Sequence, residues 1–290
     1  MKEKTRTHVL SLMEKRDFDL AVNILEAEEG PKALGMLMTC YRVSGKFLKE
    51  HEASQRFCQL YSDDKTLKKD ERKYLEDARK TLVIFEKCGL YDFNVQITDY
   101  SSFQTKERSD ESYPESDYVN KVLKRRNEDL TRQLIQKIEK EKSSSDAELR
   151  EKAFFAAAEL YNSMKRYDYA FYHYYQAIKI NPNKALYWGY ATYALFMDVR
   201  SKKDDPGTIC SAYLSGMFGQ KAMDLDRNNA RWRHYYALAL SLFASRNPIY
   251  IHQVIVETRK ALALCRPEQI PLKKNLMEFL SHAEALEQRI

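Results

Sequence analysis

Hydrophobic residues recur every three or four positions along most of the chain, and this spacing predicts α-helices. From residue 151 to residue 267 the hydrophobic stretches come in pairs separated by short polar turns. The 290 residues include only eight glycines and seven prolines. Because an all-β protein needs a turn roughly every 8–12 residues, this composition favours long helices joined by short loops. We therefore expect an all-α fold.

Between residues 153 and 185, very small residues alternate with aromatic ones. Small residues allow two antiparallel helices to approach closely, and the rings fill the spaces beside the contact. A 34-residue window that starts at Glu151 places the following residues at regular positions: Phe154, Ala157, Ala158, Tyr161, Ala170, Tyr174, Ala177 and Pro182. Most tyrosines of this stretch are therefore expected to belong to a core.

Two further windows repeat the pattern. Trp188 follows Phe154 by 34 residues, and Trp232 follows Trp188 by 44, the excess being an insertion at residues 200–207. Both tryptophans of the chain thus occupy the same position of the repeat. Self-similarity at such a period is typical of proteins built from stacked helix pairs.

This pattern resembles the tetratricopeptide repeat (TPR), and the resemblance is clearest over residues 151–267. It implies a TPR-like α-solenoid of antiparallel helix pairs. The last segment, residues 271–290, is hydrophobic on one side and is expected to be a capping helix. Its inward positions are Leu272, Leu276, Phe279, Leu280 and Leu286.

The chain divides by composition into four parts. Residues 1–97 read as a helical region of degenerate repeats, and residues 98–117 as an acidic, serine-rich linker. Residues 118–142 read as a basic amphipathic helix, which either packs on the repeats or holds a partner. Residues 151–290 hold the repeats and the capping helix.

Motifs for catalysis are missing from the sequence. It contains no glycine-rich phosphate loop, no HExxH and no GxSxG, and its six histidines never pair with cysteine or carboxylate at metal-ligand spacing. We expect a non-enzyme that needs no cofactor and no metal.

The distribution of cysteines and the length of the longest apolar stretch indicate the cellular compartment. The five cysteines are scattered without a CxxC, which favours reduced thiols. The longest mainly apolar stretch, residues 185–197, is shorter than the roughly 20 residues that span a bilayer. A cytoplasmic or nuclear protein without a membrane span is expected.

In the family that the chain resembles, the first helices of successive repeats line a groove for a partner. Carrying those positions over gives a partner-binding groove that is mainly apolar: Phe155, Glu159, Tyr193, Phe196, Met197, Arg233 and Leu240. A subset of TPR proteins holds acidic chaperone tails with a carboxylate clamp, but Phe155 and Glu159 stand where that clamp needs lysine and asparagine. We expect no such clamp. The upstream helices or the 118–142 helix could fill the groove instead.

Three functions remain open. The first is an adaptor that holds another protein by an apolar or helical segment. The second is RNA binding, because residues 119–142 carry a net charge of about +4 and some TPR relatives line a basic channel. Its contacts would be Lys121, Lys124, Arg125, Arg126 and Arg132. The third is a regulatory subunit of an enzyme, which the sequence does not separate from the first.

Overall fold

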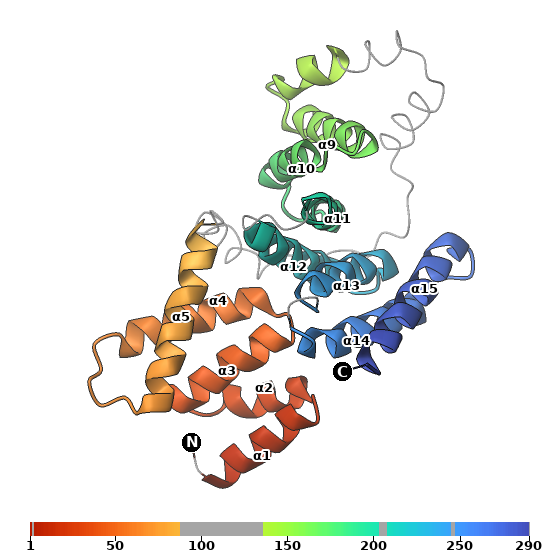
Figure 1. Cartoon of the computed structure of the whole chain (residues 1–290). Helices are drawn as coiled ribbons and strands as arrows, with labels where there is room; N and C mark the ends of the chain where they lie inside the picture. Colours follow the sequence, from red (N-terminus) through yellow and green to blue (C-terminus); the bar gives the residue numbers. More distant parts are fainter. Residues whose placement is uncertain (2, 88–135, 203–207, 245–246, 290) are drawn as a thin grey trace. The chain divides into compact units, whose positions relative to one another are not determined.

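The structure is a computed structural model that describes residues 1, 3–87, 136–202, 208–244 and 247–289 (Figure 1). These residues form helices and turns, with no strand among them, which confirms the predicted all-α, TPR-like class of paired helices. The helices are α1 (Glu3–Glu14), α2 (Phe18–Glu26), α3 (Pro31–Val43), α4 (Phe47–Tyr61), α5 (Lys69–Lys87), α9 (Ala147–Ser163), α10 (Tyr167–Ile180), α11 (Ala185–Ser201), α12 (Thr208–Leu225), α13 (Ala230–Ala244), α14 (Ile249–Leu264) and α15 (Ile270–Glu287).

One kind of turn joins the helices of three pairs, α1–α2, α3–α4 and α9–α10. Each turn has one residue in the left-handed region, namely Arg16 (φ 61°), Gly45 (φ 74°) or Lys165 (φ 60°). The next residue donates its N–H to the carbonyl five positions earlier, at 2.9, 2.8 and 2.9 Å respectively. This is the Schellman arrangement, which satisfies carbonyls at a helix end and reverses the chain. The helix pairs near the N-terminus therefore share their turn with the clearest repeat.

The chain forms two compact units. Unit 1 comprises Met1–Ser102, Leu240–Lys260 and Lys273–Ile290, and unit 2 comprises Phe103–Ala239 and Ala261–Leu272. The sequence-based division kept residues 151–290 together, whereas contacts group much of the C-terminal part with the N-terminal helices. Two contacts inside unit 1 illustrate this grouping: the Phe47 and Phe243 rings lie 4.9 Å apart, and Arg16 pairs with Glu287 at 2.8 Å.

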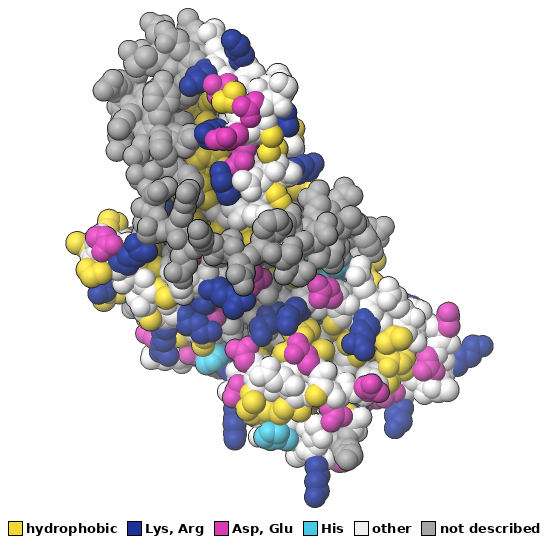
Figure 2. Space-filling view, turned by 180° about the vertical axis from the view of Figure 1, so that it is seen from behind, with side chains coloured by type: hydrophobic (Ala, Val, Ile, Leu, Met, Phe, Trp, Pro, Cys, Tyr) yellow, Lys and Arg dark blue, Asp and Glu magenta, His cyan; other side chains and the backbone are white. Residues whose placement is uncertain are grey.

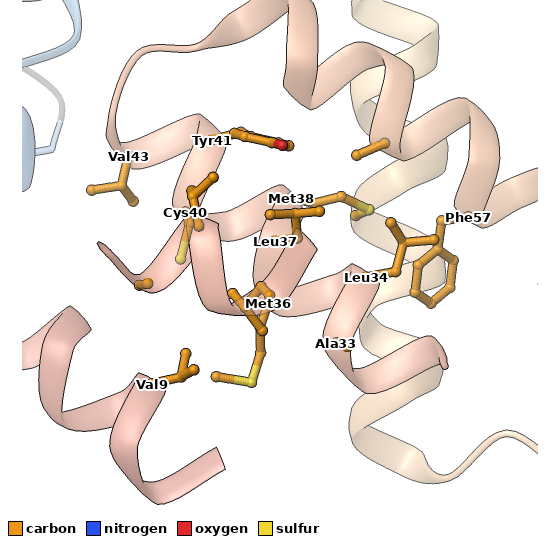
Figure 3. Close-up of a cluster of buried hydrophobic side chains, with 14 of the residues drawn as sticks. Val9, Ala33, Leu34, Met36, Leu37, Met38, Cys40, Tyr41, Val43 and Phe57 are labelled. Atoms are coloured by element: carbon orange, nitrogen blue, oxygen red, sulfur yellow. The ribbon is translucent and has the colours of Figure 1, made fainter. Parts of the chain in front are cut away.

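The core of unit 1 is built mainly from α1 to α5 (Figure 3). Helix α3 is buried on nearly all sides, because α2, α4 and α5 all contact it. Its contribution includes Met36, Met38 and Cys40, and burial raises the pKa of the Cys40 thiol to about 12. This thiol is therefore a packing residue rather than a nucleophile.

The core of unit 2 follows the predicted alternation of small and large side chains. Ala158, Ala170 and Ala177 are completely buried where α9, α10 and α11 meet, and so is the ring of Tyr174. The tyrosine excess in this stretch is thus partly a matter of packing, as expected.

A glycine in each unit makes room for an aromatic ring of a neighbouring first helix. A Cβ added to Gly35 in α3 would lie 2.2 Å from the Tyr74 ring, and one added to Gly189 in α11 would lie 2.2 Å from the Trp232 ring. Trp188, at the repeat position equivalent to Trp232, packs instead beside Phe218 of α12 at 4.9 Å. The two tryptophans share a sequence position but differ in these neighbours: Trp232 lies over Gly189 of α11, and Trp188 lies beside Phe218 of α12.

Helix α15 has fewer buried side chains than its sequence pattern suggested. Leu276 and Ala283 are buried, but Leu286 is 51% exposed. The prediction that Leu286 points inward is wrong, since Ala283 rather than Leu286 fills the inward position of the last turns.

Candidate functional site

The first helices of unit 2 carry a continuous row of aromatic side chains, which we call the aromatic row: Phe155, Tyr187, Tyr190, Tyr193, Trp232 and Tyr235. The Phe155 ring lies 5.4 Å from that of Tyr187 and 6.1 Å from that of Tyr190. Tyr190 lies 5.6 Å from Trp232, and Tyr193 lies 5.0 Å from Tyr235. These contacts join α9 to α11 and α11 to α13, so the row links three successive first helices.

Hydrogen bonds tie the row to polar neighbours. The Tyr174 hydroxyl donates to the Glu159 carboxylate, and the Arg231 guanidinium donates to the Tyr190 hydroxyl at 3.1 Å. Burial raises the pKa of Tyr174, and the neighbouring Glu159 carboxylate raises it further. Burial likewise raises the pKa of Tyr193 and of Tyr235. All three phenols therefore stay protonated at neutral pH, and Tyr174 donates its hydrogen to Glu159.

A second polar anchor lies at the beginning of α9. The buried Glu151 carboxylate accepts hydrogen bonds from the Tyr187 hydroxyl at 2.5 Å, from Asn181 at 3.1 Å and from the Lys184 ammonium. Since a buried carboxylate is tolerated only when it is well hydrogen-bonded, this cluster fixes the turn between α10 and α11 against α9. It positions the aromatic row.

The predicted groove residues differ in accessibility. Phe155 is 2% exposed and Phe196 is 4% exposed, because neighbouring rings and helices cover them. Leu240, on α13, is 0% exposed, so a partner has no access to it. Glu159, Tyr193, Met197 and Arg233 are half-buried on the first helices of unit 2. The accessible part of the predicted groove is therefore more polar than its sequence suggested.

The predicted basic contacts, Lys121, Lys124, Arg125, Arg126 and Arg132, lie outside the described residues. The described end of that segment, residues 136–142, is helical, and Ile138 is buried. On the face shown in Figure 2, side chains of both charges are interspersed, with hydrophobic side chains between them in small groups.

Sequence reasoning missed four members of the aromatic row: Tyr187, Tyr190, Trp232 and Tyr235. Tyr190 and Tyr235 fall outside the positions that the family uses for partners, although the surplus of tyrosines was a signal. The buried Asn162 Oδ1 has no hydrogen-bond partner among the described residues. Asn162 lies on α9 one turn after Glu159, so an unsatisfied acceptor stands on the helix that also carries Phe155.

A stack of planar groups lies on α9 and α10. The Arg166 guanidinium covers the Tyr169 ring at 4.4 Å, and Tyr169 stacks on Tyr161 at 5.3 Å. Tyr161 in turn stacks on the His173 imidazole at 5.2 Å, with an angle of 9° between the planes. Burial, followed by the nearby Lys142 ammonium, lowers the pKa of His173 to about 4, while Glu139 opposes the shift.

Acid is expected to destabilise the protein through this histidine. Below pH 6.5, the ordinary pKa of histidine, the imidazole binds a proton in the unfolded chain, whereas in the native protein it stays neutral down to about pH 4. The free energy of unfolding therefore falls as the pH decreases over this window. His173→Phe should remove about 1–2 kcal/mol of the loss between pH 7 and pH 5. Guanidinium unfolding at both pH values measures it. An unchanged pH dependence in the variant would contradict the assignment.

Among the described residues, no group of three or more His, Cys, Asp or Glu side chains is placed to hold a metal ion. No described helix combines the length and the apolar character needed to cross a membrane.

Comparisons with known proteins give little. No family model matches the chain, and no curated protein matches it. Among solved structures, the chain is similar to the complex of the TPR2AB domain of yeast Sti1 with pHSP90, with 13% sequence identity, a TM-score of 0.37, and coverage of 97% of this chain and 98% of that one. A likeness this weak carries no functional argument, so the TPR-like description rests on the helix pairs and their turns.

Proposed function

We propose that this chain is a non-catalytic adaptor that binds a partner protein on the first-helix surface of unit 2. The observation that carries the proposal is the aromatic row. Its rings pack three successive first helices against one another. A surface that is already ordered before a partner arrives loses little conformational entropy on binding. Tyrosine is also enriched where proteins bind one another, since it offers a large ring and a hydroxyl.

The accessible side chains define the partner's chemistry. Tyr193 contributes a ring and a donor, Met197 an adaptable thioether, and Glu159 and Arg233 one charge of each sign. Because Phe155 and Phe196 are buried, a purely apolar helix face would find little to contact. A segment with mixed polar and apolar side chains fits better. Asn162 adds an acceptor for a backbone N–H if the surface opens slightly on binding.

The test compares two tyrosines of unit 2. Tyr193 belongs to the aromatic row, whereas Tyr172 is 54% exposed on α10 and lies outside it. Affinity purification from nuclease-treated native lysate should recover stoichiometric partners with the wild type and with Tyr172→Ser. Recovery should fall about tenfold or more with Tyr193→Ser, the loss expected for a central interface residue.

A thermal melt of each variant serves as the control for folding. Tyr193→Ser that melts like the wild type and yet retains every partner would overturn the proposal. If Tyr193→Ser is unstable, Met197→Ser offers a half-buried position at the edge of the same surface, with the same expected loss.

RNA binding remains the alternative function. Its proposed contacts lie outside the described residues, so it rests on the charge of residues 119–142 alone. Phosphate contacts weaken steeply with salt. A labelled RNA that binds at 50 mM salt and dissociates at about 200 mM salt would favour this alternative, and retention of partners after nuclease treatment would favour the adaptor.

A further inference from the structure

Unit 1 contains a hollow of about 750 Å³ at the place where α2 turns into α3 and α4 packs beside them. Its apolar lining is Leu25, Leu34, Leu37, Tyr41, Ala53 and Leu60, and all of these except Leu60 are buried. Leu60 is 57% exposed, although it is a large aliphatic side chain.

The turn that shapes the hollow is fixed by its backbone. Gly30 has a φ of 99°, which favours glycine, and Pro31 is the first residue of α3. The lining residues of α3 and α4 recur at intervals of three or four, so they lie on one face of each helix. The hollow is therefore built from rigid elements on both sides.

The rim of the hollow is acidic. Four carboxylates line it, from Glu26, Glu28, Glu29 and Glu52, against two cations, Lys49 and Arg56. The hydrogen bond from the Tyr41 hydroxyl, at 2.5 Å, and the nearby Lys49 ammonium lower the pKa of Glu26, so this carboxylate is ionised. The Glu26–Lys49 pair, at 3.3 Å, spans the hollow from α2 to α4.

Two of the rim carboxylates are left without a cation. Glu28 pairs with the Met1 amine at 3.6 Å. Glu29 and Glu52 are exposed, and neither makes an ion pair or side-chain hydrogen bond within the described part of the chain. An excess of negative charge beside the exposed Leu60 side chain disfavours nucleic acid and acidic peptide tails, and it favours a cationic partner.

We propose that this hollow is a second docking site, which binds a peptide segment bearing lysine or arginine next to one or two large apolar side chains. The apolar side chains contact Leu60 and Tyr61, and the cations face Glu29 and Glu52. The site is separate from the first-helix surface of unit 2 and does not depend on the function proposed for that surface.

The experiment uses three fluorescein-labelled 14-residue peptides with the full chain. The first has leucines at helical spacing with lysines and alanines between them, the second replaces every lysine by glutamate, and the third replaces every leucine by serine. Fluorescence anisotropy should detect saturable binding of the first peptide and not of the other two. Binding should weaken at higher salt, since the rim is exposed.

Variants locate the binding. Glu29→Lys combined with Glu52→Lys should weaken the first peptide about tenfold, because two attractive contacts become repulsive, and Arg56→Glu should strengthen it. The matched control combines Glu14→Lys with Glu76→Lys, which changes the net charge equally at exposed positions outside the hollow. Equal loss in both double variants would overturn the proposal, as would no binding to the wild type.

Sedimentation of the same proteins tests another occupant. A concentration-dependent dimer of the wild type that the Glu29→Lys, Glu52→Lys variant abolishes would assign the hollow to a second copy of this chain and would also overturn the proposal. A chain that remains monomeric while it binds the lysine peptide supports it.

Discussion

Replacing Gly189 by alanine is expected to lower the free energy of unfolding of unit 2 by about 2 kcal/mol. The added Cβ would lie 2.2 Å from Cε3 of Trp232, closer than any carbon contact allows. On an exposed helix the same change would stabilise by up to about 1 kcal/mol, because alanine favours the helix more than glycine does. The sign of the effect therefore tests whether α13 packs on α11 through the Trp232 ring.

Tryptophan fluorescence is a suitable probe, since both tryptophans of the chain lie in unit 2. Trp232→Leu relieves the clash, so the costs of Gly189→Ala and Trp232→Leu should not add when they are combined. Gly219→Ala in α12 is the control: its nearest neighbour would be Cα of Tyr236 at 3.1 Å, and its effect should be smaller. Stabilisation by Gly189→Ala would show that the two helices do not meet in this way.

Arg42→Ala should have the largest effect in unit 1, with a loss of about 3–5 kcal/mol. The Arg42 Nε donates to the Glu50 carboxylate at 2.6 Å, and Arg42 also donates to the Thr81 hydroxyl at 3.0 Å. Glu50 is fully buried, and desolvation raises its pKa in spite of the nearby Arg42 guanidinium. Without the arginine, a charged carboxylate would remain in the core.

Glu50→Ala should cost much less than Arg42→Ala. The buried alanines Ala21 and Ala170 lie three residues after the first residue of α2 and α10, and Glu50 occupies the same place in α4. Alanine therefore suits this position, and Arg42 is exposed enough to turn toward water. Combining the two changes should recover most of the loss caused by Arg42→Ala alone.

The pH dependence of Arg42→Ala offers an independent check. Loss of Arg42 removes the cation that lowers the pKa of Glu50, so this carboxyl binds its proton at a higher pH in the folded variant than in the wild type, and the stability deficit should shrink as the pH falls from 7 toward 5. Guanidinium unfolding followed by circular dichroism measures both effects. A deficit that does not change with pH, or a Glu50→Ala variant as unstable as Arg42→Ala, would argue against a buried ionised pair.

The sequence by itself determined the helical class and the repeat. Its hydrophobic spacing placed the helices, and the alternation of alanines with rings identified Ala158, Ala170, Ala177 and Tyr174 as core residues, because helix packing obeys local size rules that a sequence displays directly. The lack of any catalytic motif was also visible at this level, and it led to the expectation of a non-enzyme.

Only the tertiary structure decided which side chains remain accessible. Phe155 and Phe196 looked available for a partner, but both are buried; rings of α10 and α11 cover Phe155, and such contacts depend on residues distant along the chain. The grouping of residues 240–260 and 273–290 with the N-terminal helices, and the acidic hollow beside Leu60, arise in the same way. Local periodicity specifies an element and its buried face, whereas the neighbour that buries this face is set by long-range packing.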